Sequence, residues 1–378
     1  MLYSVRIAGN CSAKKIVWYG ADSDIKYVSK EKEQDMDIKE KMLPAPMDGG
    51  FRMEGYWVWC GSVAKGEDSK YHMFAARWPK WLPMHPGWLL KSEIVRAVAD
   101  KVEGPYTYCE TVLGARGAQY WDGRMTHNPS IMKVGNKWVL YYIGSTHPFD
   151  EPVEGETISL EDPRVIVARA NKRIGMAVAD HITGPWKRMD APIMTVRPDH
   201  QDNYFVSNPA PLLDENNELL MLYKYRSYEQ TKDGRVTYSK MRLNAARAEQ
   251  YDGIYVRKTE QIFEEDIELE DPFIWKENGV YQMIAKDMKG NICGEWMGGT
   301  YATSQDGIHW DMRRNYLAYS RNVLWEDGKV RLMGNLDRPF IYFEDGKPRC
   351  LFFATSDGKE DGFMDATGTW NMAIPLKP

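Results

Sequence analysis

Carboxylate side chains stand directly before several short apolar segments of this sequence, and the densest group lies in residues 269–275 (LEDPFIW). Glu270 and Asp271 are adjacent there, and Lys286 and Asp287 end the next apolar segment. Crowded carboxylates raise one another's pKa and are typical of functional sites. Hydrolysis of a glycosidic bond needs two carboxyl groups, one protonated and one ionised. The segment therefore predicts acid/base chemistry on a sugar, although Asp271 could serve only to close a turn.

Two further acidic positions precede similar segments. Asp122 stands five residues before His127, and a loop aspartate beside a histidine can hold and orient a water molecule, although an Asx turn is the alternative. Asp337 is followed by Arg338, whose planar guanidinium suits a sugar hydroxyl or carboxylate. A structural ion pair between neighbouring elements is the alternative for Asp337 and Arg338.

These positions give a set of predicted roles. The general acid is Glu270 or Asp271, and the base is Asp122 or Asp337. The predicted catalytic residues are Asp122, Glu270, Asp271 and Asp337, and the predicted substrate-binding residues are Glu54, Trp59, Trp121, His127, Asn128, Asn208, Asp287 and Arg338.

A repeated unit explains how residues so far apart could meet. Four copies open with a polar residue and a proline, at Asn128-Pro129, Asn208-Pro209, Asp271-Pro272 and Arg338-Pro339. A divergent fifth copy opens at Cys60. Each continues through a turn into a second strand, a third strand and an outer strand, because proline is tolerated at a strand start and glycine or asparagine forms the turns. Five four-stranded antiparallel sheets of about 65–80 residues predict an all-β fold, a five-bladed β-propeller.

The propeller is expected to span residues 51–378, after an N-terminal extension of residues 1–50. Residues 3–7 alternate like a strand and could close the ring by pairing in the last blade. The predicted blade starts are Glu54, Asp122, Asp202, Glu270 and Asp337. Since the inner strands of a propeller line its axis, these starts would converge on one funnel.

Composition excludes several classes of partner. The formal charge of -5 and the lack of Lys/Arg runs argue against a nucleic-acid-binding protein. Five widely spaced cysteines and seven histidines show no zinc-site spacing, so no cofactor or catalytic metal is predicted, and a structural cation on the axis is left open. The 14 Trp and 22 Tyr suit sugar rings, although most would pack in the blades. A carbohydrate is the predicted partner, and the oligomeric state is left open.

The chain shows no apolar run of about 20 residues, the length of a membrane span, so no membrane partner is predicted. Its first ten residues lack the layout of a secretory leader. A cytoplasmic protein is expected from the sequence as written, or a periplasmic or secreted one if a leader has been removed.

The strand starts, together with residues 304–310 (SQDGIHW), resemble the five-bladed propeller glycoside hydrolases of family 43 and their relatives in families 32 and 117. The resemblance covers the chain beyond about residue 50 and lies in the blade pattern. It implies an inverting mechanism, with an aspartate base opening the first blade, an aspartate that modulates the pKa and a glutamate acid opening a later blade. Glu270 matches the acid, whereas the first-blade position carries Cys60, which implies a divergent member.

The leading prediction is a glycoside hydrolase that cleaves a terminal bond of a plant or algal oligo- or polysaccharide. A glycoside phosphorylase of the family 130 kind is the second possibility; it would need clustered cationic side chains to hold phosphate. A carbohydrate-binding propeller without catalysis is the third, favoured by the missing acid at Cys60.

Overall fold

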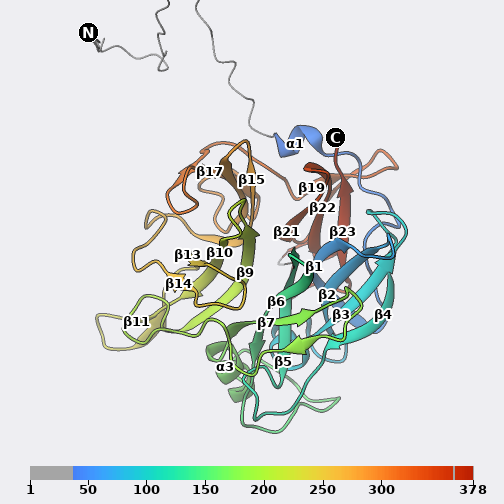
Figure 1. Cartoon of the computed structure of the whole chain (residues 1–378). Coiled ribbons are helices and arrows are strands. Elements are labelled where there is room, and N and C mark those ends of the chain that lie inside the picture. Colours follow the sequence, from blue (N-terminus) through green and yellow to red (C-terminus); the bar gives the residue numbers. More distant parts are fainter. Residues whose placement is uncertain (1–36, 361, 378) are drawn as a thin grey trace, which may run out of the picture. The chain divides into compact units, whose positions relative to one another are not determined.

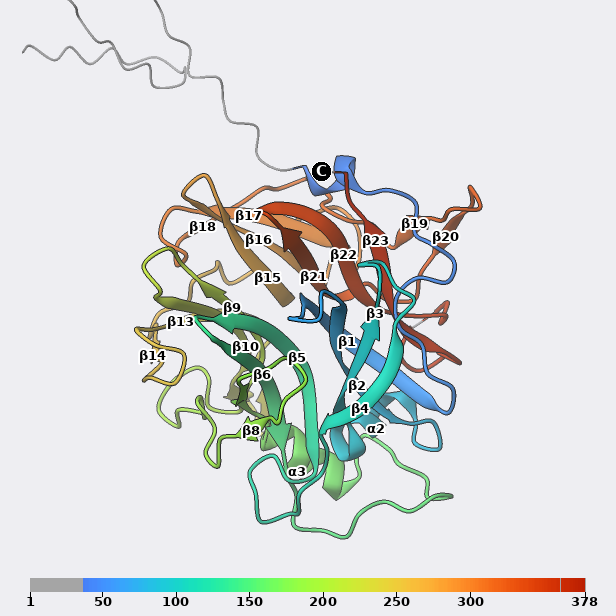
Figure 2. The same cartoon turned by 45° about the vertical axis from the view of Figure 1, so that its right-hand side comes forward.

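Five antiparallel β-sheets surround a common axis in the computed structural model, which describes residues 37–360 and 362–377. Figure 2 shows the sheets side by side around this axis, with β1, β5, β9, β15 and β21 nearest to it. Each of these inner strands contacts the inner strands of the two adjacent blades. The predicted all-β, five-bladed propeller is therefore confirmed.

The blades follow one another along the chain. Blade 1 contains β1 (Tyr56–Lys65), β2 (Tyr71–Pro79), β3 (Glu93–Ala99) and β4 (Thr107–Leu113). Blade 2 contains β5 (Met125–Val134), β6 (Lys137–Ser145), β7 (Arg173–Ala179) and β8 (Lys187–Arg188). Blade 3 contains β9 (Phe205–Leu213), β10 (Leu219–Arg226), β13 (Arg242–Ala248) and β14 (Val256–Arg257). Blade 4 contains β15 (Leu269–Glu277), β16 (Val280–Asp287), β17 (Gly299–Ser304) and β18 (Trp310–Met312). Blade 5 contains β21 (Asp337–Glu344), β22 (Lys347–Ser356) and β23 (Thr369–Pro375).

Blade 5 has three strands, and the segment before blade 1 covers its outer edge. Phe51 forms an antiparallel bridge with Asn371, and Met42 forms one with Leu376. Figure 1 shows the start of this segment, at α1 (Ile38–Lys41), beside the C-terminal end. Pairing the edge of β23 removes an exposed row of backbone donors and acceptors. The predicted ring-closing residues 3–7 lie outside the described part of the chain.

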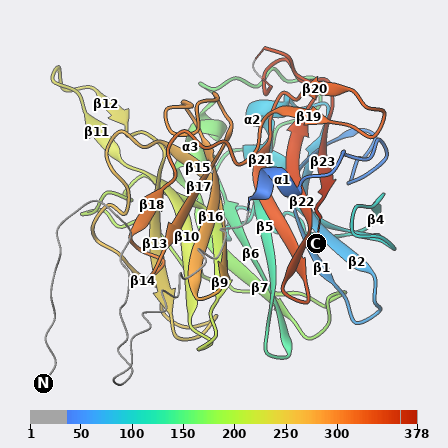
Figure 3. The same cartoon turned by 90° about the horizontal axis from the view of Figure 1, so that it is seen from above.

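The long connections lie at the end of the propeller where the inner strands begin. In an antiparallel sheet the second strand ends beside the start of the first, so the connection from second to third strand emerges there. In blades 1 to 3 this connection holds α2 (Met84–Lys91), α3 (Pro163–Ala170) and the hairpin of β11 (Tyr228–Gln230) with β12 (Val236–Tyr238). Figure 3 shows these elements, with the hairpin of β19 (Asn322–Leu324) and β20 (Val330–Leu332), along one side. None of the helices in the described residues is long and apolar enough to cross a membrane.

Every inner strand carries the same backbone feature near its start, a single residue in the left-handed region with φ between +52° and +55°. These residues are Cys60, Asn128, Asn208, Asp271 and Arg338. The pairing register with the second strand shifts at or close to the same point, as in a β-bulge. Asparagine and aspartate tolerate this conformation, whereas cysteine and arginine adopt it only when their surroundings hold them. The repeat thus places one distorted residue of each blade at the same level of the axis.

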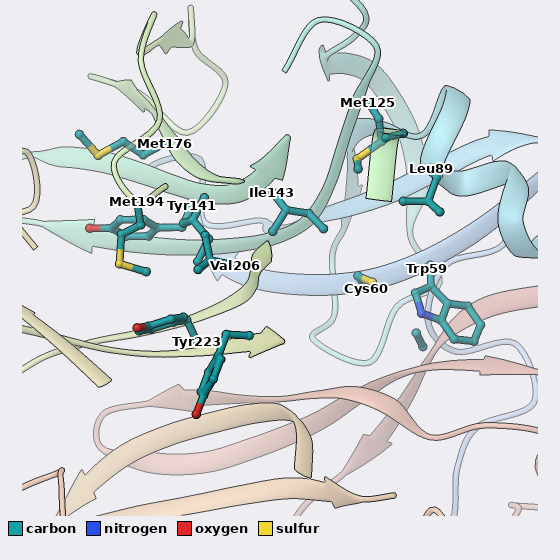
Figure 4. Close-up of a cluster of buried hydrophobic side chains, with 14 of the residues drawn as sticks. Trp59, Cys60, Leu89, Met125, Tyr141, Ile143, Met176, Met194, Val206 and Tyr223 are labelled. Atoms are coloured by element: carbon teal, nitrogen blue, oxygen red, sulfur yellow. The ribbon is translucent and has the colours of Figure 1, made fainter. Parts of the chain in front are cut away.

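Apolar side chains fill the space between adjacent blades. Figure 4 shows part of one such cluster, which extends over blades 1 to 3 and includes Tyr141, Met176, Val206 and Tyr223. All four side chains are fully buried. Burying aromatic and sulfur-containing side chains between radial sheets supplies most of the stabilisation of such a fold. The positions of the inner strands, and of the side chains they carry, are therefore fixed by packing on both faces.

Candidate active site

The five left-handed residues form a chain of contacts across the axis, which we call the axial ring (Cys60, Asn128, Asn208, Asp271 and Arg338). The Cys60 thiol donates to Asn128 Oδ1 at 2.6 Å, and Asn128 Nδ2 donates to Asn208 Oδ1 at 2.7 Å. Asn208 Nδ2 donates to Asp271 Oδ1 at 2.5 Å, and the Arg338 backbone N–H donates to Asp271 Oδ2 at 3.2 Å. The predicted residues Asn128, Asn208, Asp271 and Arg338 therefore lie together, where they connect the blades through hydrogen bonds.

Cys60 occupies the position where the family resemblance implies a base. Burial raises the pKa of its thiol well above the usual value, and Asp271, Asp337 and Glu270 add to that shift while Arg338 opposes it. The thiol stays protonated and serves as a hydrogen-bond donor in the axial ring. The substitution that weakened the family resemblance thus has a structural role in this chain.

Three carboxylates gather around one buried ammonium group directly beside the axial ring. Lys286 Nζ lies 2.9 Å from Asp337 Oδ1, 3.1 Å from Glu270 Oε2 and 3.9 Å from Asp271 Oδ2. Lys286 is only 1% exposed, and Glu270 is the most accessible of the four side chains at 14%. Lys224 Nζ pairs with the other oxygen of Glu270. We call Glu270, Asp271, Asp337, Lys224 and Lys286 the carboxylate–lysine cluster.

Burial and neighbouring charges shift the pKa values of Asp337 and Glu270 in opposite directions. Burial raises the pKa of Asp337 to about 7, with Asp271 and Glu270 adding to the shift and Lys286 opposing it. Burial alone would also raise the pKa of Glu270, but Lys224 and Lys286 outweigh it and hold that pKa well below its usual range. One carboxyl group thus stays ionised while a neighbour can carry a proton near neutral pH. Such separation is how proteins assign acid and base roles to two similar groups.

His127 and Trp59 lie next to the axial ring on the inner strands of blades 2 and 1. His127 Nδ1 lies 2.8 Å from Ser92 Oγ, and its ring stacks on Trp88 with centroids 4.6 Å apart. Burial lowers the pKa of His127 well below its usual value, with Arg338, Lys172 and Lys224 adding to the shift, so the imidazole is neutral. Trp59 is buried against Phe363, with ring centroids 5.8 Å apart.

Asp122 has a different set of partners from the carboxylate–lysine cluster. Its fully buried carboxylate accepts hydrogen bonds from Arg116 Nε at 2.6 Å and from Tyr142 Oη at 2.9 Å, and Arg188 lies 3.4 Å away. Asp202 in blade 3 repeats this arrangement with two arginines and a tyrosine, through Arg197, Arg257 and Tyr223. The repetition indicates that these aspartates brace their blades, and the contacts do not bring Asp122 to Glu270, Asp271 and Asp337 as predicted.

The other predicted binding residues also lie in local structural contacts. The carboxylate of Asp287 accepts backbone N–H groups of Lys289, Gly290, Ile292 and Cys293, which folds the loop after β16. Trp121 stacks on Tyr142 with ring centroids 5.6 Å apart. Glu54 is exposed in the turn before β1. The structure thus gives Asp287 and Trp121 bracing contacts, and their predicted contacts with substrate stay predictions.

Sequence reasoning left Lys172, Lys224, Phe205 and Ser207 out of the predicted site. Lys224 and Lys286 occupy corresponding places in two blades, since each pairs with the residue just before the bulge, Ser207 in blade 3 and Glu270 in blade 4. Lys172 precedes β7, and its ammonium lies 3.6 Å from the centroid of the Phe205 ring. A search for lysines opposite each bulge could have found Lys224.

The donor set on the axis does not suit the structural cation left open by the sequence. The axial ring has two amides, a protonated thiol and a single carboxylate, and Arg338 Nη1 lies 3.8 Å from that carboxylate. Lys286 supplies a second positive charge to the same group. Over residues 37–360 and 362–377, no three His, Cys, Asp or Glu side chains are placed to hold a metal ion. Side-chain cations thus stand where a metal ion would have to bind.

An axial cavity of about 240 Å³ lies on the other side of the axial ring. It is lined mainly by the residues that follow each bulge, such as Gly61, Ser130, Ala210, Phe273 and Phe340. Arg338 is the one ionisable residue in this lining, and the lining contains none of the carboxylates of the cluster. The cavity therefore lacks an acid pair, whereas the carboxylate–lysine cluster lies at the end of the axis where the inner strands begin.

Comparison with known proteins yields matches in structure only. No protein-family model matches the chain, and no curated protein matches its sequence. The solved complex of BT0996 with RGII is similar to it with a TM-score of 0.62 at 14% identity, covering 90% of this chain and 93% of that one. Zg3597, a family 117 glycoside hydrolase of the marine bacterium Zobellia galactanivorans, gives a TM-score of 0.59 at 11% identity over 89% of each chain.

A thermostable family-43 glycoside hydrolase is also similar, with a TM-score of 0.53 at 12% identity over 85% of this chain and 89% of that one. At identities this low, the structural similarity establishes a common fold, and any function has to be argued from the residues of the site. The chain therefore has the five-bladed propeller fold of glycoside hydrolases of families 43 and 117, as a divergent representative of it.

Proposed function

We propose that this chain is a glycosidase that removes a terminal sugar from a plant or algal oligo- or polysaccharide. Asp337 is the proton donor in this proposal, and Glu270 is the ionised carboxylate. The observation that carries the proposal is the binding of both carboxyl groups to Lys286, at 2.9 and 3.1 Å, with pKa values shifted in opposite directions. A carboxylic acid with a pKa near the working pH is suited to give its proton to a leaving oxygen.

The roles differ from those predicted from the sequence for a physical reason. Glu270 was expected to be an acid, but two lysines stabilise its charged form. Among the described residues Asp337 has only Lys286 as a cationic partner, and it lies beside two other carboxylates, so it is the group that can hold a proton. We therefore assign the acid to blade 5 and the ionised carboxylate to blade 4.

The spacing of the pair bears on the stereochemistry. The two oxygens each lie about 3 Å from one nitrogen, so these two atoms are no more than about 6 Å apart, which is compatible with the about 5–5.5 Å of retaining pairs and below the about 6.5–9.5 Å of inverting pairs. Glu270 would attack the anomeric carbon and form a glycosyl ester while Asp337 protonates the leaving oxygen. Water would then cleave the ester, giving its proton to Asp337. Net retention is proposed in place of the inversion that the family resemblance implies.

Phosphorolysis remains a second candidate because the site holds more cations than the sequence indicated. Lys172, Lys224, Lys286 and Arg338 all lie in or beside the carboxylate–lysine cluster. Clustered cations of this kind can bind a phosphate ion that takes the place of water. The two candidates differ in the product, which is a free reducing sugar after hydrolysis and a sugar phosphate after phosphorolysis.

A panel of aryl glycosides and plant and algal oligosaccharides, assayed with and without phosphate, tests the proposal. We expect a reducing sugar without phosphate, and losses of at least about a hundredfold in kcat for Glu270→Gln and for Asp337→Asn. Glu265→Gln is the matched control, since Glu265 is exposed in the loop before β15. Release of sugar phosphate only would favour the second candidate. Equal turnover by all variants, or no turnover of any substrate, would contradict the proposal.

A further inference from the structure

Lys172 is a buried cation without a counter-ion in the part of the chain that the structure describes. The residue follows the C-cap of α3 in the chain and is 4% exposed. The ammonium lies 3.6 Å from the ring centroid of Phe205 and 5.5 Å from that of Trp88. Within residues 37–360 and 362–377 this ammonium makes no hydrogen bond and no ion pair. Burying an unpaired charge is costly, so such a group calls for an explanation.

The neighbouring acids are already shared among other cations. Glu270 pairs with Lys224 and Lys286, Asp337 pairs with Lys286, and Asp271 lies near Lys286 and Arg338. Four cationic side chains, with Lys172, therefore stand against three carboxyl groups. When it is protonated, Lys172 carries the surplus positive charge, at the side of the cluster toward blade 2.

Unused hydrogen-bonding capacity accompanies this charge. Ser207 precedes the bulge of blade 3, the place that Glu270 and Asp337 occupy in blades 4 and 5. Its hydroxyl is buried and has no hydrogen-bond partner among the described residues. Phe205 lies two residues earlier on the same face of β9, and its ring is within 5.9 Å of the Lys224 ammonium as well. Ser207 is the register partner of Lys224 and shares a strand face with Phe205, whose ring lies near both ammonium groups.

We propose that Lys172, with Ser207, binds an anionic substituent of the substrate, a carboxylate or a sulfate ester on the sugar ring. The inference rests on the proposed function and names its substrate class, an acidic glycan. An anion beside Lys172 would balance the surplus charge and accept a hydrogen bond from the Ser207 hydroxyl. Phe205 and Trp88 would face the apolar side of the sugar ring. Burial lowers the pKa of Lys172 well below its usual value, with Lys224 adding to the shift, and a bound anion would reverse that shift.

Binding of monosaccharides to the full chain, measured by titration calorimetry, tests this inference without turnover. Glucuronate and galacturonate are compared with glucose and galactose, and galactose 6-sulfate provides the sulfate arm. We expect at least one acidic sugar to bind at least tenfold more tightly than its neutral partner, and the arm that binds identifies the anion. Lys172→Met should bring that ratio close to one without weakening the neutral sugar. Lys172→Arg should keep part of the preference.

Lys187→Met is the matched control, because Lys187 is exposed on β8 of the same blade. Its ratio should equal that of the unmodified chain. Thermal unfolding of each variant ensures that loss of preference is not loss of fold. No preference for any acidic sugar, a preference that survives in Lys172→Met, or equally tight Lys172-dependent binding of inorganic phosphate would overturn the inference. Turnover of neutral glycosides alone would overturn the acidic substrate class and support the proposed glycosidase activity. Binding of acidic sugars without any turnover would support the acidic substrate class and contradict the glycosidase activity.

Discussion

Replacing Lys286 with methionine will destabilise the folded chain strongly, and more at pH 8 than at pH 5. The Lys286 ammonium is 1% exposed and lies within 2.9 to 3.9 Å of three carboxylates. Methionine fills a similar volume but leaves those carboxylates buried with less compensating charge. Removing one partner of a buried ion pair costs about 3–5 kcal/mol, and we expect a loss of that size at pH 8.

The pH dependence follows from proton binding. The pKa of Asp337 is already raised to about 7 in the folded chain, and removal of Lys286 takes away the cation that opposes this rise. A carboxyl group with a raised folded pKa binds more protons in the folded state than in the unfolded state. Stability is then present at low pH and is lost as pH rises through the window from about 4 to above 7. At pH 5 the variant recovers part of its loss by protonating the cluster.

Urea unfolding at pH 5 and pH 8 measures both effects. Lys276→Met is the matched control on the same blade, since Lys276 pairs with the exposed Glu215 and such surface pairs are worth at most about 1 kcal/mol. In Lys286→Met combined with Asp337→Asn, the loss at pH 8 should be smaller than in Lys286→Met alone, because one uncompensated charge is gone. A loss below about 1 kcal/mol, or one that is the same at both pH values, would refute this view of the cluster.

Three other changes test separate parts of the structure. Through Asp337, the unmodified chain should lose stability between about pH 4 and pH 7 by at most about 1.4 kcal/mol per pH unit. Thermal unfolding of Asp337→Asn should show a flatter dependence of stability on pH. An unchanged slope would argue against a raised pKa of Asp337. Asn208→Ala should cost about 2–4 kcal/mol in urea unfolding, because it removes the donor to Asp271 Oδ1 and puts alanine at a positive φ; a loss under about 0.5 kcal/mol would contradict the axial ring. Asp122→Asn and Asp202→Asn should each cost about 2–3 kcal/mol by the same assay, since both carboxylates lie between two arginines; very different losses would show that the two clusters are not equivalent.

The propeller could be predicted because each blade carries its own local signals. The dipeptides at Asn128, Asn208, Asp271 and Arg338 mark the bulges of four inner strands, and the divergent copy at Cys60 has the same left-handed backbone. The segment that pairs with the outer edge of the last blade was harder to predict from the sequence. The bridges at Met42 and Phe51 are isolated, without the alternation that reveals a strand.

The site could be predicted in part, for reasons that lie in the register of the strands. Glu270 and Asp337 come together because they hold corresponding places in adjacent blades, which the repeat reveals, and Asp271 directly follows Glu270. In the sequence, nothing distinguishes Lys224 from other strand residues. Its place in the site follows only from the strand register, which pairs it with the residue before a bulge. Asp122 also precedes a blade, but it forms ion pairs with Arg116 of a loop and Arg188 of an outer strand. Spacing in the sequence does not reveal these contacts.

The most direct test of the assigned roles is the dependence of kcat/KM on the leaving group. Asp337→Asn should hydrolyse a dinitrophenyl glycoside almost as fast as the unmodified chain, because that leaving group departs without a proton. The same variant should lose about 10²–10⁴-fold with a methyl glycoside, which needs the proton. An equal loss with both substrates, or no loss with either, would contradict the assignment of Asp337 as the acid partner of Glu270.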